Sequence, residues 1–171
     1  MKVEIIRYPD AEDWRRCYRL ALNTVWKDSD KEPSEAWKKK IIRSMHSPIR
    51  TLMFTVALID VPYWVSVHFS RHKIGVEHYV TSQRNDRQDM YDRNSARQDA
   101  PVVHIMDINA EAVIGISKKR MCKKAAKETR EAWEAVCSAI MEKFPYFEGE
   151  LVPPCKYGRC TEFVPCSEEK K

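Results

Sequence analysis

Residues 70–84 read SRHKIGVEHYVTSQR and place basic and hydroxyl side chains directly after an apolar stretch. Side chains along a strand alternate between two faces, so Arg71 and Lys73 should share one face while His72 points to the other. Nitrogen donors this close together at the end of a strand suit an anionic group such as phosphate. The alternative is a solvated strand edge, which basic residues commonly protect from pairing with other chains.

The composition indicates a single domain with a modest excess of positive charge. The chain has 171 residues, of which 43% are hydrophobic, and carries 30 Lys and Arg against 25 Asp and Glu for a net charge of +5. A chain of this length can bury one sizeable core but not two comfortable ones. It has neither an apolar run long enough to cross a membrane nor an apolar leader after its first residues, so we expect a cytoplasmic protein.

Strand and helix patterns alternate through the first half of the chain. The runs with strand character are 1–8, 52–59, 63–70 and 76–84. Asp60-Val61-Pro62 should join the second and third of these as a hairpin. Helices are expected to open at Asp10 or Ala11 and at the N-cap Ser34, the second with Lys38, Lys39 and Lys40 on its solvent face.

The second half contains the most regular pattern of the sequence. A long polar segment, 85–101, leads to a strand expected at 102–108, and Asn109 then caps a short helix over 110–116. From 117 to about 144, apolar side chains recur at spacings of three and four. This spacing predicts one long helix with a packing seam.

Four short motifs resemble those of the flavin-dependent thymidylate synthases (ThyX) and occur in the same order. The family's first signature is RHRxxSxNExSxRY. The matching positions are Arg71-His72-Lys73 followed by Ser82 and Arg84, Ala96-Arg97 ahead of Pro101, Asn109-Ala110, and Arg120 followed by Ala125–Arg130. The resemblance covers the chain from about residue 45 to residue 166. It implies an α+β fold, an antiparallel twisted sheet flanked by helices, with a long C-terminal helix.

The resemblance also implies roles for individual side chains. The residues that would bind FAD are Ser47, Arg71, His72, Lys73 and Asn109. Those that would bind dUMP are His68, Ser82, Arg84, Arg97 and Arg120. Arg120 would also be catalytic, because a cation can polarise the pyrimidine carbonyl and stabilise the charge that builds on the ring. For Ser47 the alternative is a simple helix-stop turn before Pro48, and for His68 a structural histidine of the sheet.

The implied reaction is the reductive methylation of dUMP to dTMP. Methylenetetrahydrofolate would give the one-carbon unit and NADPH would reduce FAD. The predicted site holds no Cys–His pair to attack the uracil, which fits chemistry without an enzyme nucleophile. Arg120 at the start of the long helix would be disfavoured by the helix dipole, which indicates an anion nearby. The family shares its sites between the subunits of a homotetramer, so we expect a tetramer.

The chain departs from the family pattern at several of these positions. Lys73 stands where the signature has an arginine, so a bidentate contact is lost, and Ser82 lies one residue late. Arg50 replaces a usual glutamate and Glu111 a usual arginine, so that arginine's contact with the flavin phosphates has no counterpart here. These differences leave open another pyrimidine nucleotide as the substrate, or a lost activity.

A cysteine-rich tail, 151–171, follows the domain expected over 1–150. Its cysteines are Cys155, Cys160 and Cys166. Clustered cysteines in a cytosolic protein favour metal over disulfide. With Cys122 as a fourth thiolate they would form a structural zinc site, and reduced free thiols are the alternative.

A non-enzymatic nucleic-acid-binding module is the competing hypothesis. The basic residues that would contact phosphates are Arg71, Lys73, Arg84, Arg87, Arg93 and Arg97. The net charge is small for this role, and these residues are not interleaved with a run of exposed aromatic side chains. We therefore expect no nucleic-acid partner and no membrane.

Overall fold

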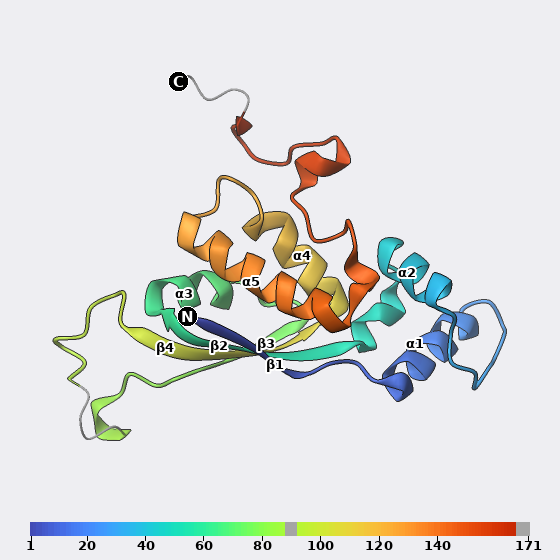
Figure 1. The fold of residues 1–171 in the computed structure, drawn as a ribbon, viewed down its shortest axis with the longest axis horizontal. Helices are drawn as coiled ribbons and strands as arrows, with labels where there is room; N and C mark the ends of the chain where they lie inside the picture. Colours follow the sequence, from blue (N-terminus) through green and yellow to red (C-terminus); the bar gives the residue numbers. More distant parts are fainter. Residues whose placement is uncertain (88–91, 167–171) are drawn as a thin grey trace.

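The computed structural model describes residues 1–87 and 92–166 and shows one antiparallel sheet with helices packed on one face (Figure 1). The strands are β1 (Lys2–Arg7), β2 (Met53–Pro62), β3 (Val76–Val80) and β4 (Pro101–Asn109), in the order β1-β2-β4-β3. The α-helices are α1 (Ala11–Asn23), α2 (Glu35–Arg43), α3 (Tyr63–Ser70), α4 (Ala110–Arg120) and α5 (Lys127–Lys143). The predicted α+β class, an antiparallel sheet flanked by helices, is confirmed.

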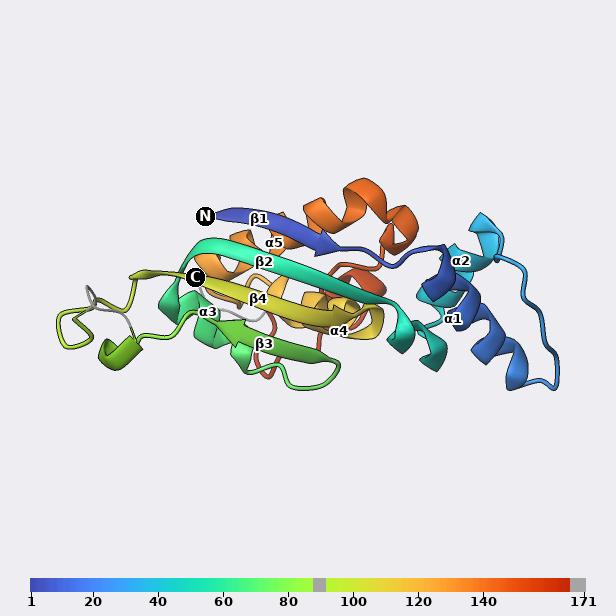
Figure 2. The same ribbon diagram turned by 90° about the horizontal axis from the view of Figure 1, so that it is seen from below.

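The strand register decides which side chains face the helices. In the central pair, Val56 of β2 lies opposite Met106 of β4, and both are fully buried with Phe54 and Ile108. Burying an apolar side chain of this size stabilises the fold by about 1.5–3 kcal/mol. Seen from below in Figure 2, the strands lie in front of α4 and α5, so the core fills the space between the sheet and these helices.

The first two helices begin where they are expected, and each has a side-chain cap. The Asp10 side chain accepts from the Glu12 amide at 2.8 Å, and Ser34 Oγ accepts from the Trp37 amide at 3.3 Å. Such caps satisfy backbone N–H groups that have no partner inside the helix. α1 and α2 lie together beyond one end of the sheet (Figure 1).

The predicted solvent face of α2 is wrong at Lys38, which is only 5% exposed. Its ammonium lies 2.9 Å from a Glu32 carboxylate oxygen, 3.0 Å from one of Glu35, and over the ring of Trp14. A lysine can be buried when carboxylates pair with it and an aromatic face covers it.

The hairpin predicted over 52–70 is also wrong. β2 continues through an irregularity near Asp60, which has a φ of 57°, and ends at Pro62, after which the chain forms helix α3. The helix buries Val65 and Phe69 on one side, four residues apart. Strand propensity is overridden here by packing against the sheet, because Val65 and Phe69, four residues apart, share one face in a helix as well as in a strand, while Val67 is exposed.

The long helix predicted over 117–144 is two helices. α4 continues to Arg120, and after a turn in which Ala125 donates to the Cys122 carbonyl, α5 lies beside it (Figures 1 and 2). The buried Trp133 indole of α5 donates to Ser117 Oγ of α4 at 2.8 Å. At 1.5 Å per residue a single helix of this length would run to about 40 Å, beyond a strand the length of β4 at about 30 Å.

The break between α4 and α5 changes the position of Arg120. This residue lies in the last turn of α4 and not near the start of a long helix. A cation is favoured at the C-terminal end of a helix dipole. The electrostatic argument that placed an anion beside Arg120 on the basis of helix position is therefore wrong.

Two segments extend from the compact part of the structure. β3 ends at Val80 and not at residue 84, and the polar segment that follows projects from the sheet with a short 3₁₀ turn, Asn85–Arg87; residues 88–91 lie outside the described part. The tail carries a second such turn, Pro154–Tyr157, and its last residues, 167–171, also lie outside. Within the described ranges, none of the helices has the length and apolar character needed to cross a membrane.

Candidate functional site

The basic run 71–73 opens onto a cavity of about 410 Å³. Its lining residues are Met45, Arg71, His72, Lys73, Ile74, Glu111, Ala112, Gly115 and Ile116. The segment between α3 and β3 supplies the basic side chains, and α4 supplies a mostly apolar wall. A methyl group built on Gly115 would meet no other atom within 4 Å, so this part of the helix surface is open to a flat ligand.

Arg120 joins the end of α4 to this segment. Its Nε donates to His72 Nε2 at 3.0 Å, and its Nη2 donates to the His68 carbonyl oxygen at 2.6 Å. A guanidinium only donates, so His72 Nε2 must accept, and the uncharged imidazole carries its proton on Nδ1. Burial, followed by the charge of Arg120, lowers the pKa of His72 to about 4. His72 is therefore a neutral ring at physiological pH.

Among the described residues, the cations of this site are not paired with carboxylates, because Glu111, which also lines the cavity, pairs with Arg50. In the ranges that the structure describes, no Asp or Glu forms an ion pair with Arg71, Lys73 or Arg120. Arg120 is partly buried, and burial together with the charge of Arg71 lowers its pKa. Cations that are partly desolvated and repel each other create a site with a preference for an anion.

His68 contributes through its backbone. Its ring nitrogen Nδ1 lies 2.8 Å from Thr129 Oγ1 of α5, and its ring packs edge-on against Trp64. The imidazole is therefore held by protein groups, while the carbonyl of the same residue orients Arg120. His68 lies in a helix, so its expected place in a sheet is wrong.

Asn109 fixes the start of α4 beside the cavity. Its side-chain Oδ1 accepts from the Ala112 backbone amide at 2.9 Å, which is the predicted helix cap. Its backbone amide donates to the Gly75 carbonyl at 2.9 Å. Gly75 has a φ of +73°, and a Cβ there would lie 2.5 Å from Asn109 Nδ2. Only glycine fits this left-handed position against Asn109.

Arg50 and Glu111, the two charged residues that depart from the family pattern, pair with each other. Arg50 Nε lies 2.6 Å from Glu111 Oε2, and a second contact measures 3.1 Å. The pair ties the 3₁₀ turn Ser47–Thr51 to the first turn of α4, at the side of the cavity. Ser47, the predicted flavin contact, begins this turn but does not line the cavity.

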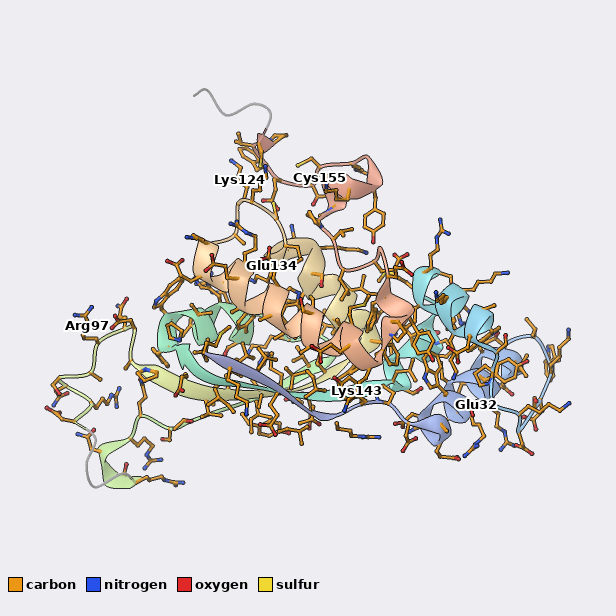
Figure 3. All side chains as sticks on the ribbon, in the orientation of Figure 1. Glu32, Arg97, Lys124, Glu134, Lys143 and Cys155 are labelled. Carbon is orange, nitrogen blue, oxygen red and sulfur yellow. The ribbon has the colours of Figure 1, made fainter. Side chains whose placement is uncertain are left out.

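The predicted nucleotide contacts of the projecting segment lie elsewhere. Arg84 pairs with Asp86 at 2.9 Å and Arg97 with Asp99 at 2.8 Å, and Figure 3 shows Arg97 far out on this segment. The Ser82 hydroxyl accepts from the Arg84 amide at 3.3 Å. Within one chain the structure thus brings together Arg71, His72, Lys73 and Arg120 but not Ser82, Arg84 or Arg97.

The four cysteines of the predicted zinc site do not come together. Cys122 is buried, whereas Cys155, Cys160 and Cys166 are exposed. Across the residues described, no group of three or more His, Cys, Asp and Glu is placed to hold a metal ion. The spacing of the tail cysteines alone does not produce a metal centre in this structure.

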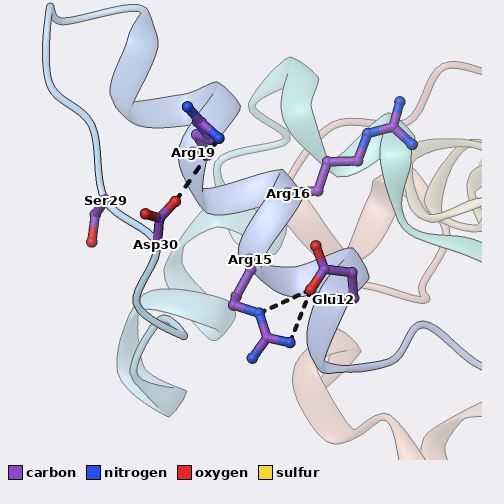
Figure 4. Close-up of a pocket in the computed structure, with 6 residues that line it drawn as sticks. All are labelled: Glu12, Arg15, Arg16, Arg19, Ser29 and Asp30. Carbon is purple, nitrogen blue, oxygen red and sulfur yellow. Dashed lines mark hydrogen bonds and ion pairs between the residues drawn. The ribbon is translucent and has the colours of Figure 1, made fainter.

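A second hollow, of about 360 Å³, lies on α1 (Figure 4). Its lining residues are Glu12, Arg15, Arg16, Arg19, Ser29 and Asp30. Here acids match most of the cations: Arg15 lies 2.9 Å from Glu12, and Arg19 lies 3.9 Å from Asp30. This hollow lacks the unbalanced charge of the cavity beside α4, which is therefore the stronger candidate for an anionic ligand.

Comparisons with known proteins identify the fold. No family model and no curated protein sequence matches the chain. Among solved structures, a thymidylate synthase X (ThyX) from Helicobacter pylori with FAD and dUMP has a TM-score of 0.66 at 16% identity, over 88% of this chain and 99% of that one. Another structure of ThyX from the same organism, also with FAD and dUMP, has a TM-score of 0.65 at 16% identity, with the same coverage.

A third similar structure is a UMP/dUMP methylase, PolB from Streptomyces cacaoi, bound with 5-Br dUMP. Its TM-score is 0.66 at 13% identity, over 90% of this chain and 97% of that one. Together these similarities show that the chain has a ThyX-like fold, as the motifs predict. At these identities the similarity establishes the architecture, and the activity has to be argued from the site.

Sequence reasoning missed Gly115, which lines the cavity, and Gly75, which packs against Asn109. A signal for Gly115 was present, because a glycine inside a helix costs about 1 kcal/mol relative to alanine and needs a reason. The contact between Arg120 and His72 joins residues 48 positions apart, and local patterns do not reveal it.

Proposed function

We propose that the protein is a flavin-dependent enzyme that methylates a uracil nucleotide, with the conversion of dUMP to dTMP as its reaction. FAD would occupy the cavity, and methylenetetrahydrofolate and NADPH would be the co-substrates. The observation that carries this proposal is the unbalanced charge of Arg71, Lys73 and Arg120 beside an apolar wall. A planar ring that bears phosphates satisfies both features, and the ThyX-like fold supports this choice.

The lining of the cavity fits a flavin. Arg71 and Lys73 can donate to phosphate oxygens, and the neutral His72 ring can donate from Nδ1. Ala112, Gly115 and Ile116 offer an apolar surface to a ring system. We include Ser47 and Asn109 in the flavin site because they fix the turn and the helix end beside it. Bound there, FAD would supply hydride transfer, and the chain would orient it.

Arg120 is the proposed catalytic residue. Its contacts with His72 and the His68 carbonyl hold the guanidinium in one orientation. A fixed cation can donate to a pyrimidine carbonyl and stabilise negative charge on the ring as the reaction proceeds. Removing one such donor commonly costs about 2.7–4 kcal/mol of transition-state stabilisation, a hundredfold or more in rate.

The remaining nucleotide contacts would come from a neighbouring subunit. Arg84 and Arg97, with Ser82, project away from the cavity of their own chain, so we propose that they reach the cavity of another chain in a homotetramer. His68 would contribute to the nucleotide site through its position beside Arg120. The expected location of this assembly is the cytoplasm.

A second candidate is the same chemistry on UMP. The similarity to a UMP/dUMP methylase favours it. The two substrates differ by the ribose 2′-hydroxyl, so a direct comparison of dUMP with UMP separates the two candidates.

The test begins with the visible spectrum of the purified protein and continues with turnover. We expect flavin absorption, and tritium release from [5-³H]dUMP or [5-³H]UMP when FAD, NADPH and methylenetetrahydrofolate are present. The Arg120→Gln variant tests the proposed catalytic residue and should release about a hundredfold less tritium than the wild type. Colourless protein that binds oligonucleotides in a salt-sensitive manner would overturn the proposal in favour of a nucleic-acid-binding module.

A further inference from the structure

Three side chains from three elements form a hydrogen-bonded chain that ends on the basic run. His78 Nε2 of β3 lies 2.7 Å from the His72 carbonyl oxygen. His78 Nδ1 lies 2.9 Å from Nε2 of His104, in β4, and His104 Nδ1 lies 2.9 Å from Ser66 Oγ, in α3. His104 and Ser66 are almost completely buried. None of these three side chains lines the cavity.

The acceptor at the end of the chain fixes the direction of every hydrogen bond. A carbonyl oxygen only accepts, so His78 Nε2 must donate to His72. With uncharged rings, His78 Nδ1 then accepts from His104 Nε2, and His104 Nδ1 accepts from the Ser66 hydroxyl. His104 is uncharged at neutral pH, since burial lowers its pKa to about 4. Each hydrogen bond of the chain therefore has one donor and one acceptor, running from Ser66 through His104 and His78 to the His72 carbonyl.

The segment that receives this hydrogen bond, 71–75, has no regular secondary structure. Backbone hydrogen bonds hold its two ends: the His72 amide donates to Phe69 and the Gly75 carbonyl accepts from Asn109, each at 2.9 Å. Between these points, the peptide that joins His72 to Lys73 is held through the His72 carbonyl by His78. Rotation of that peptide would redirect the side chains on both sides of it.

We propose that His78 is a positioning residue for the cavity. By holding the His72 carbonyl it fixes the direction in which Arg71 and Lys73 present their charges to an anionic ligand. His104 and Ser66 keep His78 in the tautomer that donates to this carbonyl. The inference rests on the proposed function, because it assigns to His78 the alignment of the flavin-binding cations.

Two variants of His78 separate donation to the carbonyl from other effects. In His78→Gln the side-chain amide nitrogen can take the place of Nε2 and still donate to His72. In His78→Asn the shorter amide reaches only the place of Nδ1, so that donation is lost. We expect the Kd for FAD to stay within about threefold of wild type for Gln and to rise about tenfold for Asn.

A second readout does not depend on flavin. Amide hydrogen exchange over 71–75, measured without ligand, should become about tenfold faster in His78→Asn and stay near wild type in His78→Gln. Where the Asn variant does not fold, Ser66→Ala replaces it, with an expected acceleration of about threefold. If the wild-type protein does not bind FAD, the proposed function fails, and the exchange data still decide the role of His78. Equal exchange in all variants, or equal acceleration in Asn and Gln, would overturn the role.

Discussion

Arg120 Nε lies 3.0 Å from His72 Nε2, so a guanidinium and a neutral imidazole share one hydrogen bond between the end of α4 and the basic segment. The contact orients both groups: Arg120 cannot rotate without losing it, and His72 must carry its proton on the other nitrogen. It also links a residue that lines the cavity to the proposed catalytic cation.

Replacing Arg120 with Gln should affect both partners. We expect tritium release from labelled nucleotide to fall about a hundredfold, because a fixed cation near the reacting ring is lost. The pKa of His72, about 4 in the wild type, should rise because the neighbouring charge is removed, although burial continues to hold it below the usual value. NMR titration of the imidazole measures this change. An unchanged titration curve would show that the two side chains do not interact in solution.

Stability should decrease when the protein is acidified from pH 7 to pH 5. His72 and His104 both have a pKa of about 4, below the usual 6.5 of an unfolded histidine. Between pH 6.5 and pH 4 the unfolded chain binds protons that the folded chain does not. The free energy of unfolding therefore decreases as the pH is lowered. Allowing for the partial exposure of His72, we expect a loss of about 2 kcal/mol.

Urea denaturation at several pH values measures this loss. His104→Gln removes one of the two groups and should flatten the pH dependence, although it also lowers the overall stability. A variant with the same slope as the wild type would show that His104 is not responsible.

A small side chain at position 115 should leave FAD binding intact, whereas a large one should block it. Gly115→Ala is expected to stabilise the protein by about 0.5–1 kcal/mol, because alanine favours the helix and its methyl group meets open space. Gly115→Leu should also fold, but its side chain would fill the cavity and weaken FAD binding by about tenfold or more. Thermal unfolding and flavin titration test the pair. Full flavin affinity in the leucine variant would place the flavin elsewhere.

Arg50 and Glu111 should show a measurable coupling energy. The Arg50 side chain is 59% exposed and that of Glu111 25%, so we expect about 0.5–1 kcal/mol in a double-mutant cycle at low salt. The reversed pair, Arg50→Glu with Glu111→Arg, should keep this coupling. Because it also places a cation on the cavity wall, it should tighten FAD binding by about threefold. Weaker binding in the reversed pair would argue against phosphates at this position.

Local signals in the sequence predicted some elements well. Ser34 and Asn109 were correct as helix caps because a capping side chain contacts amides two or three residues away, and the first helix begins at Ala11, one of its two expected starts. The strand at 102–108 was correct because a long alternating run between two breaks fits no other element. The ThyX-like fold could be predicted because its motifs occur in order along the chain.

Non-local packing explains the failures. Helix α3 depends on the fit of Phe69 and Ser66 against the sheet, which its β-branched and aromatic residues do not indicate. The break after Arg120 falls among good helix formers such as Ala125, and it exists because two shorter helices cover the sheet. At the site, the run 71–73 was found directly, whereas its contact with Arg120 required the fold.

The arrangement of Arg97 and Arg120 leads to a test of shared sites. In one chain Arg97 lies on the projecting segment, paired with Asp99, whereas Arg120 contacts His72 beside the cavity. If each site combines Arg120 of one subunit with Arg97 of another, Arg97→Gln and Arg120→Gln proteins are each inactive alone but active as mixed tetramers. Random mixing would leave about a quarter of the sites with both arginines.

Co-expression with two different affinity tags yields the mixed tetramers, and tritium release measures their activity. The matched control mixes Arg97→Gln with Arg71→Gln, because a second cavity residue should complement Arg97→Gln in the same way. A mixture of Arg120→Gln with Arg71→Gln should not recover activity, since both residues belong to the cavity of one chain. Mixed tetramers of Arg97→Gln and Arg120→Gln that stay inactive would place every essential arginine within a single chain.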